Sequence, residues 1–163
     1  MCLAVYMGCN EELETFSEAA EGSLCFELCK WIPPRLERYN YVYYLGRKGQ
    51  GDELECSCLL MEYVEWTDKG PIVSSDDLFP SDGPCPFDTL KSYVLQTRGS
   101  LKNVTLVCDD NGGCEHKSDA SEYGELAIRP SMIKRGNLLF ADIFGSTPWR
   151  IFHVIPDKYD AQV

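Results

Sequence analysis

Cys2 carries the most direct chemical signal in the chain, because it follows Met1 and opens the apolar run 3–7. Removal of Met1 would give this residue both a thiol and a free α-amine. An α-amine titrates at about pH 7.7–8.0, so an unprotonated fraction exists at neutral pH and can take the proton of the thiol. The position predicts an amine-activated nucleophile if Met1 is removed, and a small buried side chain if Met1 stays.

A second set of side chains is suited to a metal ion. Cys56 and Cys58 are expected on one face of a strand, since alternate residues of a strand share a face. Cys108, Cys114 and His116 surround a predicted turn, and together with the first pair they would complete a tetrahedral zinc site if the two segments lie close. Neither spacing matches a common zinc signature. The alternative, that Cys58 and Cys108 fill core positions, stays open.

A glycine-rich segment, residues 46–52, places two cations in an acidic chain. Arg47 and Lys48 precede Gly49 and Gly51. Successive N–H groups beside glycines can converge on an anion, and the two cations would assist. The segment lacks the Gly-Lys-Ser/Thr ending of a P-loop. It predicts either an anion-binding or partner-docking loop, or a flexible hairpin turn whose charges are solvated.

Aromatic residues are dense in the segment that precedes these glycines. Tyr43 and Tyr44 are neighbours in a predicted strand, so their rings must lie on opposite faces. We expect one face to be a contact surface for a ligand or a protein, because tyrosine favours interfaces. A central strand that is buried on both faces is the alternative. His153, between Phe152 and Val154, is expected to be a packed or edge histidine rather than a base.

The elements that position these residues follow from periodicity and turn chemistry. Asn10 is predicted to cap a short helix that ends at Gly22, and Asp88 to cap a second helix over residues 89–98. Residues 67–87 are predicted as a long loop. Strands are predicted at 2–8, 23–32, 39–45, 54–66, 104–108, 138–144 and 149–155. We expect residues 39–66 to form one β-hairpin and the last two strands to form another.

Strand neighbours joined by short turns, without repeated strand–helix alternation, exclude a doubly wound parallel sheet. The prediction is an α+β fold with a mainly antiparallel sheet of five to seven strands and one or two helices. The 163 residues suit a single domain that spans the whole chain.

The net charge of −11, from 26 acidic and 15 basic residues, bears on the class of partner. Such a surface repels phosphate backbones and anionic membrane surfaces, so neither nucleic acid nor a membrane is expected as a partner. A basic protein surface, a cation, or a small anionic ligand in a local positive pocket is favoured. The sequence leaves the oligomeric state open.

Nine cysteines occur in the chain, and glutamates at positions 11, 12, 14 and 18 interrupt any apolar signal segment near the start. The thiols are therefore expected in a reducing cytoplasm, where they pack as small apolar side chains. No cofactor besides zinc is indicated.

Two resemblances add to these expectations. The Met-Cys start followed by a strand resembles the N-terminal-nucleophile hydrolases and class II glutamine amidotransferases over about eight residues, although Leu3 stands where the amidotransferases often have glycine. More of the chain resembles a family of uncharacterised bacterial proteins. Its shared features are the Met-Cys start, Tyr43-Tyr44-Leu45-Gly46, Cys56-Ser57-Cys58, the helix near 89–98 and a strand 104–108 that ends in Cys-Asp.

The second resemblance implies a single domain in a bacterial or phage setting and implies no activity. The leading functional expectation is therefore a small acidic cytoplasmic binding protein for a protein partner or a small anionic ligand. A cysteine-dependent amidohydrolase that acts through Cys2 and a zinc-stabilised domain are the alternatives.

Overall fold

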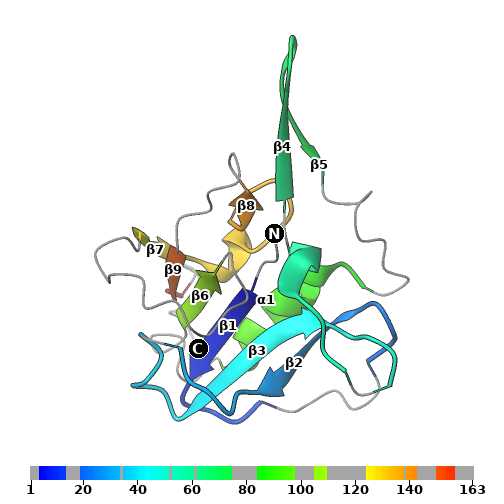
Figure 1. Cartoon of the computed structure of the whole chain (residues 1–163). Helices are drawn as coiled ribbons and strands as arrows, with labels where there is room; N and C mark the ends of the chain where they lie inside the picture. Colours follow the sequence, from blue (N-terminus) through cyan, green and yellow to red (C-terminus); the bar gives the residue numbers. More distant parts are fainter. Residues whose placement is uncertain are drawn as a thin grey trace.

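The structure is a computed structural model, and it describes residues 4–13, 19–33, 35–51, 53–60, 62–74, 84–97, 105–109, 124–137, 139–142 and 150–156. Nine strands lie in these ranges (Figure 1). They are β1 (Ala4–Cys9), β2 (Leu24–Leu28), β3 (Tyr41–Arg47), β4 (Glu62–Thr67), β5 (Gly70–Ser74), β6 (Thr105–Asp109), β7 (Gly124–Ile128), β8 (Ala141–Asp142) and β9 (Arg150–Val154). The helical elements are α1 (Pro86–Gln96) and two 3₁₀ turns, η1 (Ser57–Leu60) and η4 (Pro130–Met132).

Six of the strands form one mixed sheet in the order β2-β3-β1-β6-β9-β7, and three form a smaller sheet in the order β5-β4-β8. In the larger sheet, β1 pairs antiparallel with β3 and β6, and β2–β3 and β6–β9 are also antiparallel. Only β7 and β9 run parallel among the described strands of this sheet. The predicted α+β fold with a mainly antiparallel sheet and one or two helices is confirmed.

One face of the larger sheet, the helix face, packs against α1. Val5 and Met7 of β1 lie in one buried cluster with Leu90 and Val94 of α1. Tyr93 is also buried there, and its hydroxyl donates to the carbonyl oxygen of Leu24 at 3.1 Å. Aliphatic and aromatic side chains on both elements thus form the main core, as their spacing at alternate strand positions and at helical positions requires.

The helix begins three residues before the predicted 89–98. Pro86 occupies its first turn, where a missing N–H costs nothing and the fixed φ suits a helix. Cys85 takes the N-cap position without a side-chain cap bond, so the prediction that Asp88 caps the helix is wrong. Asp88 instead lies in the first turn, where a carboxylate suits the helix dipole.

The opposite face of the larger sheet is covered by a segment that we call the strap, residues 29–33 and 35–40. Leu36 and Tyr39 of the strap are buried against Ala4, Val42 and Ile151 of the sheet. We call this side of the sheet the strap face. A Cβ atom at Gly8 would overlap the ring of Tyr39, so glycine permits this close approach.

The hairpin predicted over residues 39–66 is confirmed around its glycine-rich tip, where Lys48 and Leu54 form an antiparallel bridge, but its long second strand is wrong. After β3, residues 53–56 fold back on the strand, but the chain then enters η1 and leaves for the smaller sheet. Ser57 is fully buried at this point: its Oγ accepts the N–H of Val5 at 2.8 Å, and its hydroxyl donates to the carbonyl oxygen of Leu45. A short apolar run does not distinguish a strand from a helical turn, which explains the error.

The loop predicted over residues 67–87 contains β5 and the start of α1, and its residues 75–83 lie outside the described part. β4 and β5 form an antiparallel hairpin that projects from the body of the molecule (Figure 1). At its base, the fully buried Glu62 accepts the N–H of Gly136 through Oε1.

The final hairpin predicted over residues 138–155 is also wrong. β8 pairs in parallel with β4, whereas β9 lies between β6 and β7 in the other sheet. β7 was not predicted, and it takes the edge position beside β9. The helix predicted after Asn10 is not present in the described residues 10–13 and 19–22, and residues 14–18 lie outside them. Asn10 instead accepts the backbone N–H of Asn40 through its side chain at 3.2 Å.

Candidate functional site

The strap face carries an aromatic hollow of about 230 Å³ near the β2 edge of the sheet. Tyr6 of β1 and Tyr44 of β3 are register partners, and their ring centroids lie 5.4 Å apart. Trp31 of the strap adds a third ring, which meets Tyr6 edge-on at 6.4 Å between centroids. The remaining lining residues are Glu27, Leu28, Cys29 and Lys30.

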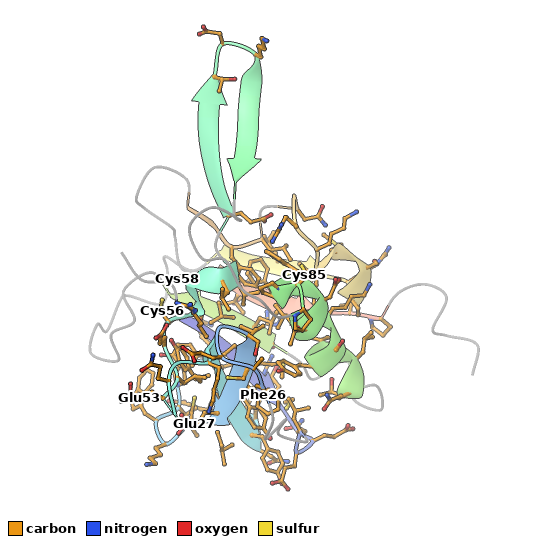
Figure 2. The ribbon with its side chains drawn as sticks, turned by 90° about the vertical axis from the view of Figure 1, so that its right-hand side faces the viewer. Phe26, Glu27, Glu53, Cys56, Cys58 and Cys85 are labelled. Carbon is orange, nitrogen blue, oxygen red and sulfur yellow. The ribbon has the colours of Figure 1, made fainter. Side chains whose placement is uncertain are left out.

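The hollow opens where apolar side chains are unusually exposed. Leu28 is 52% exposed, Trp31 42% and Ile32 43%. Single exposed apolar residues are ordinary. Leu28 lines the hollow but is the register partner of Tyr43 on the helix face, so the exposed apolar pair on the strap is Trp31 and its neighbour Ile32. An exposed apolar pair beside a hollow suits a contact surface. Glu27, the register partner of Tyr44, adds a carboxylate beside these rings. It lies in the half of the body away from the β4–β5 hairpin (Figure 2).

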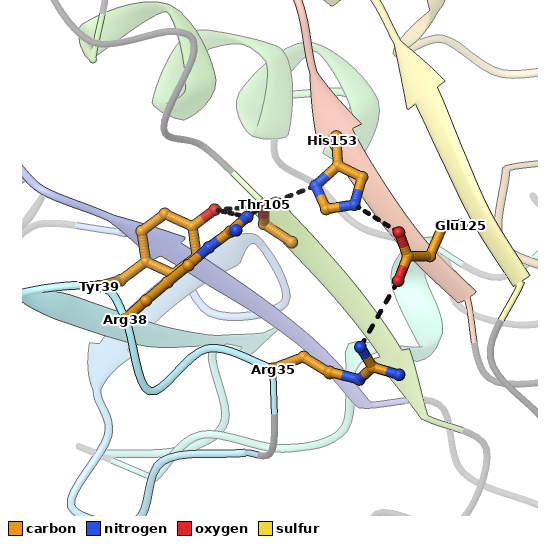
Figure 3. A network of polar contacts seen from close by, with 6 residues as sticks. All are labelled: Arg35, Arg38, Tyr39, Thr105, Glu125 and His153. Atoms are coloured by element: carbon orange, nitrogen blue, oxygen red, sulfur yellow. Dashed lines mark hydrogen bonds and ion pairs between the residues drawn. The ribbon is translucent and has the colours of Figure 1, made fainter. Parts of the chain in front are cut away.

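A polar network fixes the other end of the strap to the sheet (Figure 3). Thr105 Oγ1 contacts the Tyr39 hydroxyl and lies 3.2 Å from His153 Nδ1. His153 Nε2 lies 3.3 Å from Glu125, which also forms an ion pair with Arg35 at 3.7 Å. Side chains from β6, β7 and β9 thereby attach the strap to the larger sheet.

Thr105, His153 and Glu125 have the residue types of a nucleophilic triad, namely a hydroxyl, an imidazole and a carboxylate. Their geometry instead suits a structural role, which is to attach the strap to the sheet. Thr105 is 1% exposed, and its hydroxyl is enclosed by Tyr39, by His153 and by Arg38, whose guanidinium lies 3.5 Å away. A nucleophile needs access to the atom that it attacks. The expectation that His153 is a packed or edge histidine agrees with its position on β9 beside the edge strand β7.

The glycine-rich segment is placed at the end of β3. The backbone N–H groups of Arg47, Lys48 and Gly49 donate to the carbonyl oxygens of Cys56, Ser23 and Glu53, respectively. These three groups are therefore not available to converge on an anion. The Arg47 side chain forms an ion pair with Glu55 at 3.3 Å. Gly51 has φ of +69°, a conformation that suits a glycine in a turn.

The two tyrosines predicted as ligand contacts have different places. Tyr43 is 2% exposed on the helix face, and its hydroxyl accepts the N–H of Leu13 at 2.9 Å, so the prediction that it contacts a ligand is wrong. Tyr44 lines the hollow on the strap face and donates its hydroxyl proton to the carbonyl oxygen of Glu55 at 2.9 Å. The predicted placement of their rings on opposite faces is confirmed.

The predicted zinc ligands are not brought together in the described part of the chain, where no group of three or more His, Cys, Asp or Glu side chains is arranged for a metal ion. Cys56 precedes η1 and Cys58 lies within it, so the prediction that they share a strand face is wrong. Cys58 is buried in the core, and Figure 2 shows both thiols near the base of the hairpin. Cys2, Cys114, His116 and the side chain of Cys108 lie outside the described part.

Two buried thiols are poor nucleophiles at neutral pH. Burial raises the pKa of the Cys9 thiol to about 11, against an ordinary value of 9.0, and its Sγ donates to the carbonyl oxygen of Glu11. Burial also raises the pKa of Cys25. The thiolate is the reactive form, so both residues are packing groups at neutral pH.

Sequence reasoning identified Tyr44 but missed Tyr6, Trp31 and Glu27. Alternation in the first strand was a usable signal for Tyr6, since it puts this ring opposite Val5 and Met7. Trp31 had no such signal, because the strap brings it back onto the sheet through an irregular path.

Comparisons with protein-family models, with curated proteins and with solved structures gave no significant match. None of the described helices is long and apolar enough to cross a membrane.

Proposed function

We propose that this chain is a small acidic cytoplasmic binding protein that docks a segment of a protein partner on the strap face. The observation that carries the proposal is the aromatic hollow lined by Tyr6, Tyr44 and Trp31, next to which Ile32 of the strap is also exposed. Tyrosine and tryptophan offer large contact areas at low entropic cost, and they dominate binding energy at interfaces.

The size of the hollow favours a protein partner over a free small ligand. Small-molecule sites usually enclose about 300–1,000 Å³ and bury most of the ligand. The hollow is smaller, at about 230 Å³, and it continues into exposed apolar side chains. This combination suits one anchoring side chain within a longer docked segment. The net charge of −11 favours a basic segment over an acidic one.

A peptide selection tests this proposal without assuming the sequence of the partner. The folded protein is used to select from a random peptide library, and the affinity of enriched peptides is then measured by fluorescence polarisation. We expect Trp31→Ala to weaken binding at least tenfold. Leu126→Ala is the matched control, because Leu126 is 52% exposed, like Leu28, but lies on β7 at the other edge of the sheet.

Circular dichroism and thermal unfolding of both variants verify that they are folded. If no peptide is enriched, or if both variants bind equally well, the strap face is not the docking surface and the proposal fails.

A further inference from the structure

Three rings line the hollow, and they differ in exposure: Tyr6 is 6% exposed, so Tyr44 and Trp31 offer most of the accessible aromatic surface. Tyr6 contacts both of the others, with interplanar angles of 49° to Tyr44 and 66° to Trp31. Rings inclined in this way do not stack flat, and the edge-to-face contact of Tyr6 with Trp31 covers part of one ring face. An aromatic face that stays accessible carries partial negative charge and attracts a cation placed over it.

Among the described residues that line the hollow, the charged groups are one carboxylate and one ammonium. Glu27 and Lys30 both line it, and they are three positions apart at the end of β2 and the start of the strap. Glu27 stands opposite Tyr44 in the β2–β3 register, so its carboxylate adds to the attraction for a cation at that ring. Lys30 opposes that attraction. The two residues give opposite predictions for the charge of the occupant.

Other contacts restrain the Tyr44 ring and the strap that carries Trp31. The hydroxyl of Tyr44 donates to the carbonyl oxygen of Glu55, which orients the ring. Trp31 belongs to the strap, whose far end is fixed by buried Leu36 and by the contact of Tyr39 with Thr105. A preformed site avoids the entropic cost of ordering its side chains on binding.

We infer that the hollow is a binding site for a cationic side chain, the guanidinium of arginine or the ammonium of lysine, supplied by the docked segment of a basic partner. The source of the side chain rests on the proposed function, whereas the cation preference rests on the three rings, Glu27 and the net charge of −11. Arginine and lysine both bind over aromatic faces, and arginine is the more frequent partner.

Capped amino acids test the cation preference directly. Acetyl-arginine methylamide and acetyl-lysine methylamide are titrated into the full-length protein, and the indole N–H resonance of Trp31, assigned with Trp31→Phe, is followed by NMR. Acetyl-citrulline methylamide is the matched neutral probe, since it has nearly the shape of the arginine compound but no charge. We expect saturable shifts with the two cations at millimolar concentration and none with citrulline.

Two charge-removing variants give a second readout. Glu27→Gln is expected to weaken binding of the arginine probe about twofold to fivefold, and Lys30→Gln to strengthen it by a similar factor. Leu126→Ala is expected to leave it unchanged. The opposite order for Glu27→Gln and Lys30→Gln, or equal binding of arginine and citrulline, overturns the inference.

The inference and the proposed function fail in distinguishable ways. Selected peptides that bind through Trp31 but tolerate citrulline in place of arginine leave the docking surface intact and overturn the cation site. Shifts with acetyl-arginine methylamide in a protein that enriches no peptide support the cation site and overturn the docking function.

Discussion

At the scale of single residues, Glu62 shows how one carboxylate supports the base of the projecting hairpin. It is fully buried, Oε1 accepts the N–H of Gly136, and Oε2 has no partner among the described residues. Glu62→Ala is expected to lower the free energy of unfolding by about 1–3 kcal/mol, because the acceptor for Gly136 is lost. Glu62→Gln keeps an oxygen acceptor and is expected to lose less than half as much.

Urea unfolding at pH 7 measures both losses, with the wild-type protein as reference. Equal losses in the two variants would show that the charge of the side chain, which both substitutions remove, determines its contribution rather than the bond to Gly136.

Cys9 predicts a dependence of stability on alkaline pH. Burial raises the pKa of its thiol to about 11 in the folded state, against 9.0 when the group is exposed. Between these two values the unfolded chain loses the proton first, so the contribution of Cys9 is complete below pH 9 and falls as the pH rises towards 11. We expect the thermal midpoint of the wild type to fall more steeply over this range than that of Cys9→Ala.

Thermal unfolding at intervals from pH 7.5 to 11 measures the two slopes. Tyr93, whose pKa burial raises to about 12, contributes to the slope in both proteins and cancels in the comparison. Parallel curves would contradict the assignment to Cys9.

At the scale of elements, the return of the chain beside β3 depends on Gly46. A Cβ atom there would overlap the carbonyl oxygen of Glu55, which is backbone and cannot rotate away. Gly46→Ala is therefore expected to lower the free energy of unfolding by about 1–3 kcal/mol. Gly49→Ala is the matched control, since its nearest contact is the Glu55 side chain at 3.2 Å, and a loss below about 0.5 kcal/mol is expected.

Chemical denaturation of the two variants separates them. A loss for Gly49→Ala as large as that for Gly46→Ala would show that any side chain in the segment is destabilising, independent of the close approach to Glu55.

The strands and helix that the sequence predicted share a strong local pattern. β1 is an apolar run that is buried throughout, β3 is rich in tyrosine, and α1 has the apolar residues Leu90, Tyr93 and Val94 on one side. The sequence pattern within each strand did not predict which strands pair, because pairing and register are decided by packing against strands that are distant in the chain. β8 and β9 lie close in sequence but in different sheets, and the short run that forms η1 was compatible with two structures.

At the scale of the whole molecule, the candidate site combines three segments that the sequence keeps apart. Tyr6 and Tyr44 meet because β1 and β3 are neighbours in the sheet, and Trp31 joins them because the strap crosses the same face. The strands were predictable, but the contact between their rings needed the sheet order. The amino-acid composition indicated only that a basic partner is favoured. It did not indicate which surface of the molecule would bind that partner.

The net charge of −11 also predicts how the stability of the molecule depends on salt. Like charges repel more strongly in the compact state than in the expanded unfolded chain, and salt screens this repulsion. We expect the thermal midpoint at pH 7.5 to rise by about 2–4 °C between 20 and about 500 mM NaCl, which corresponds to about 1 kcal/mol. Near pH 4.6, the isoelectric point expected from the composition, the net charge is close to zero and the same scan is expected to show little change. A midpoint that rises equally at both pH values would assign the effect to salt exclusion from apolar surface rather than to charge repulsion.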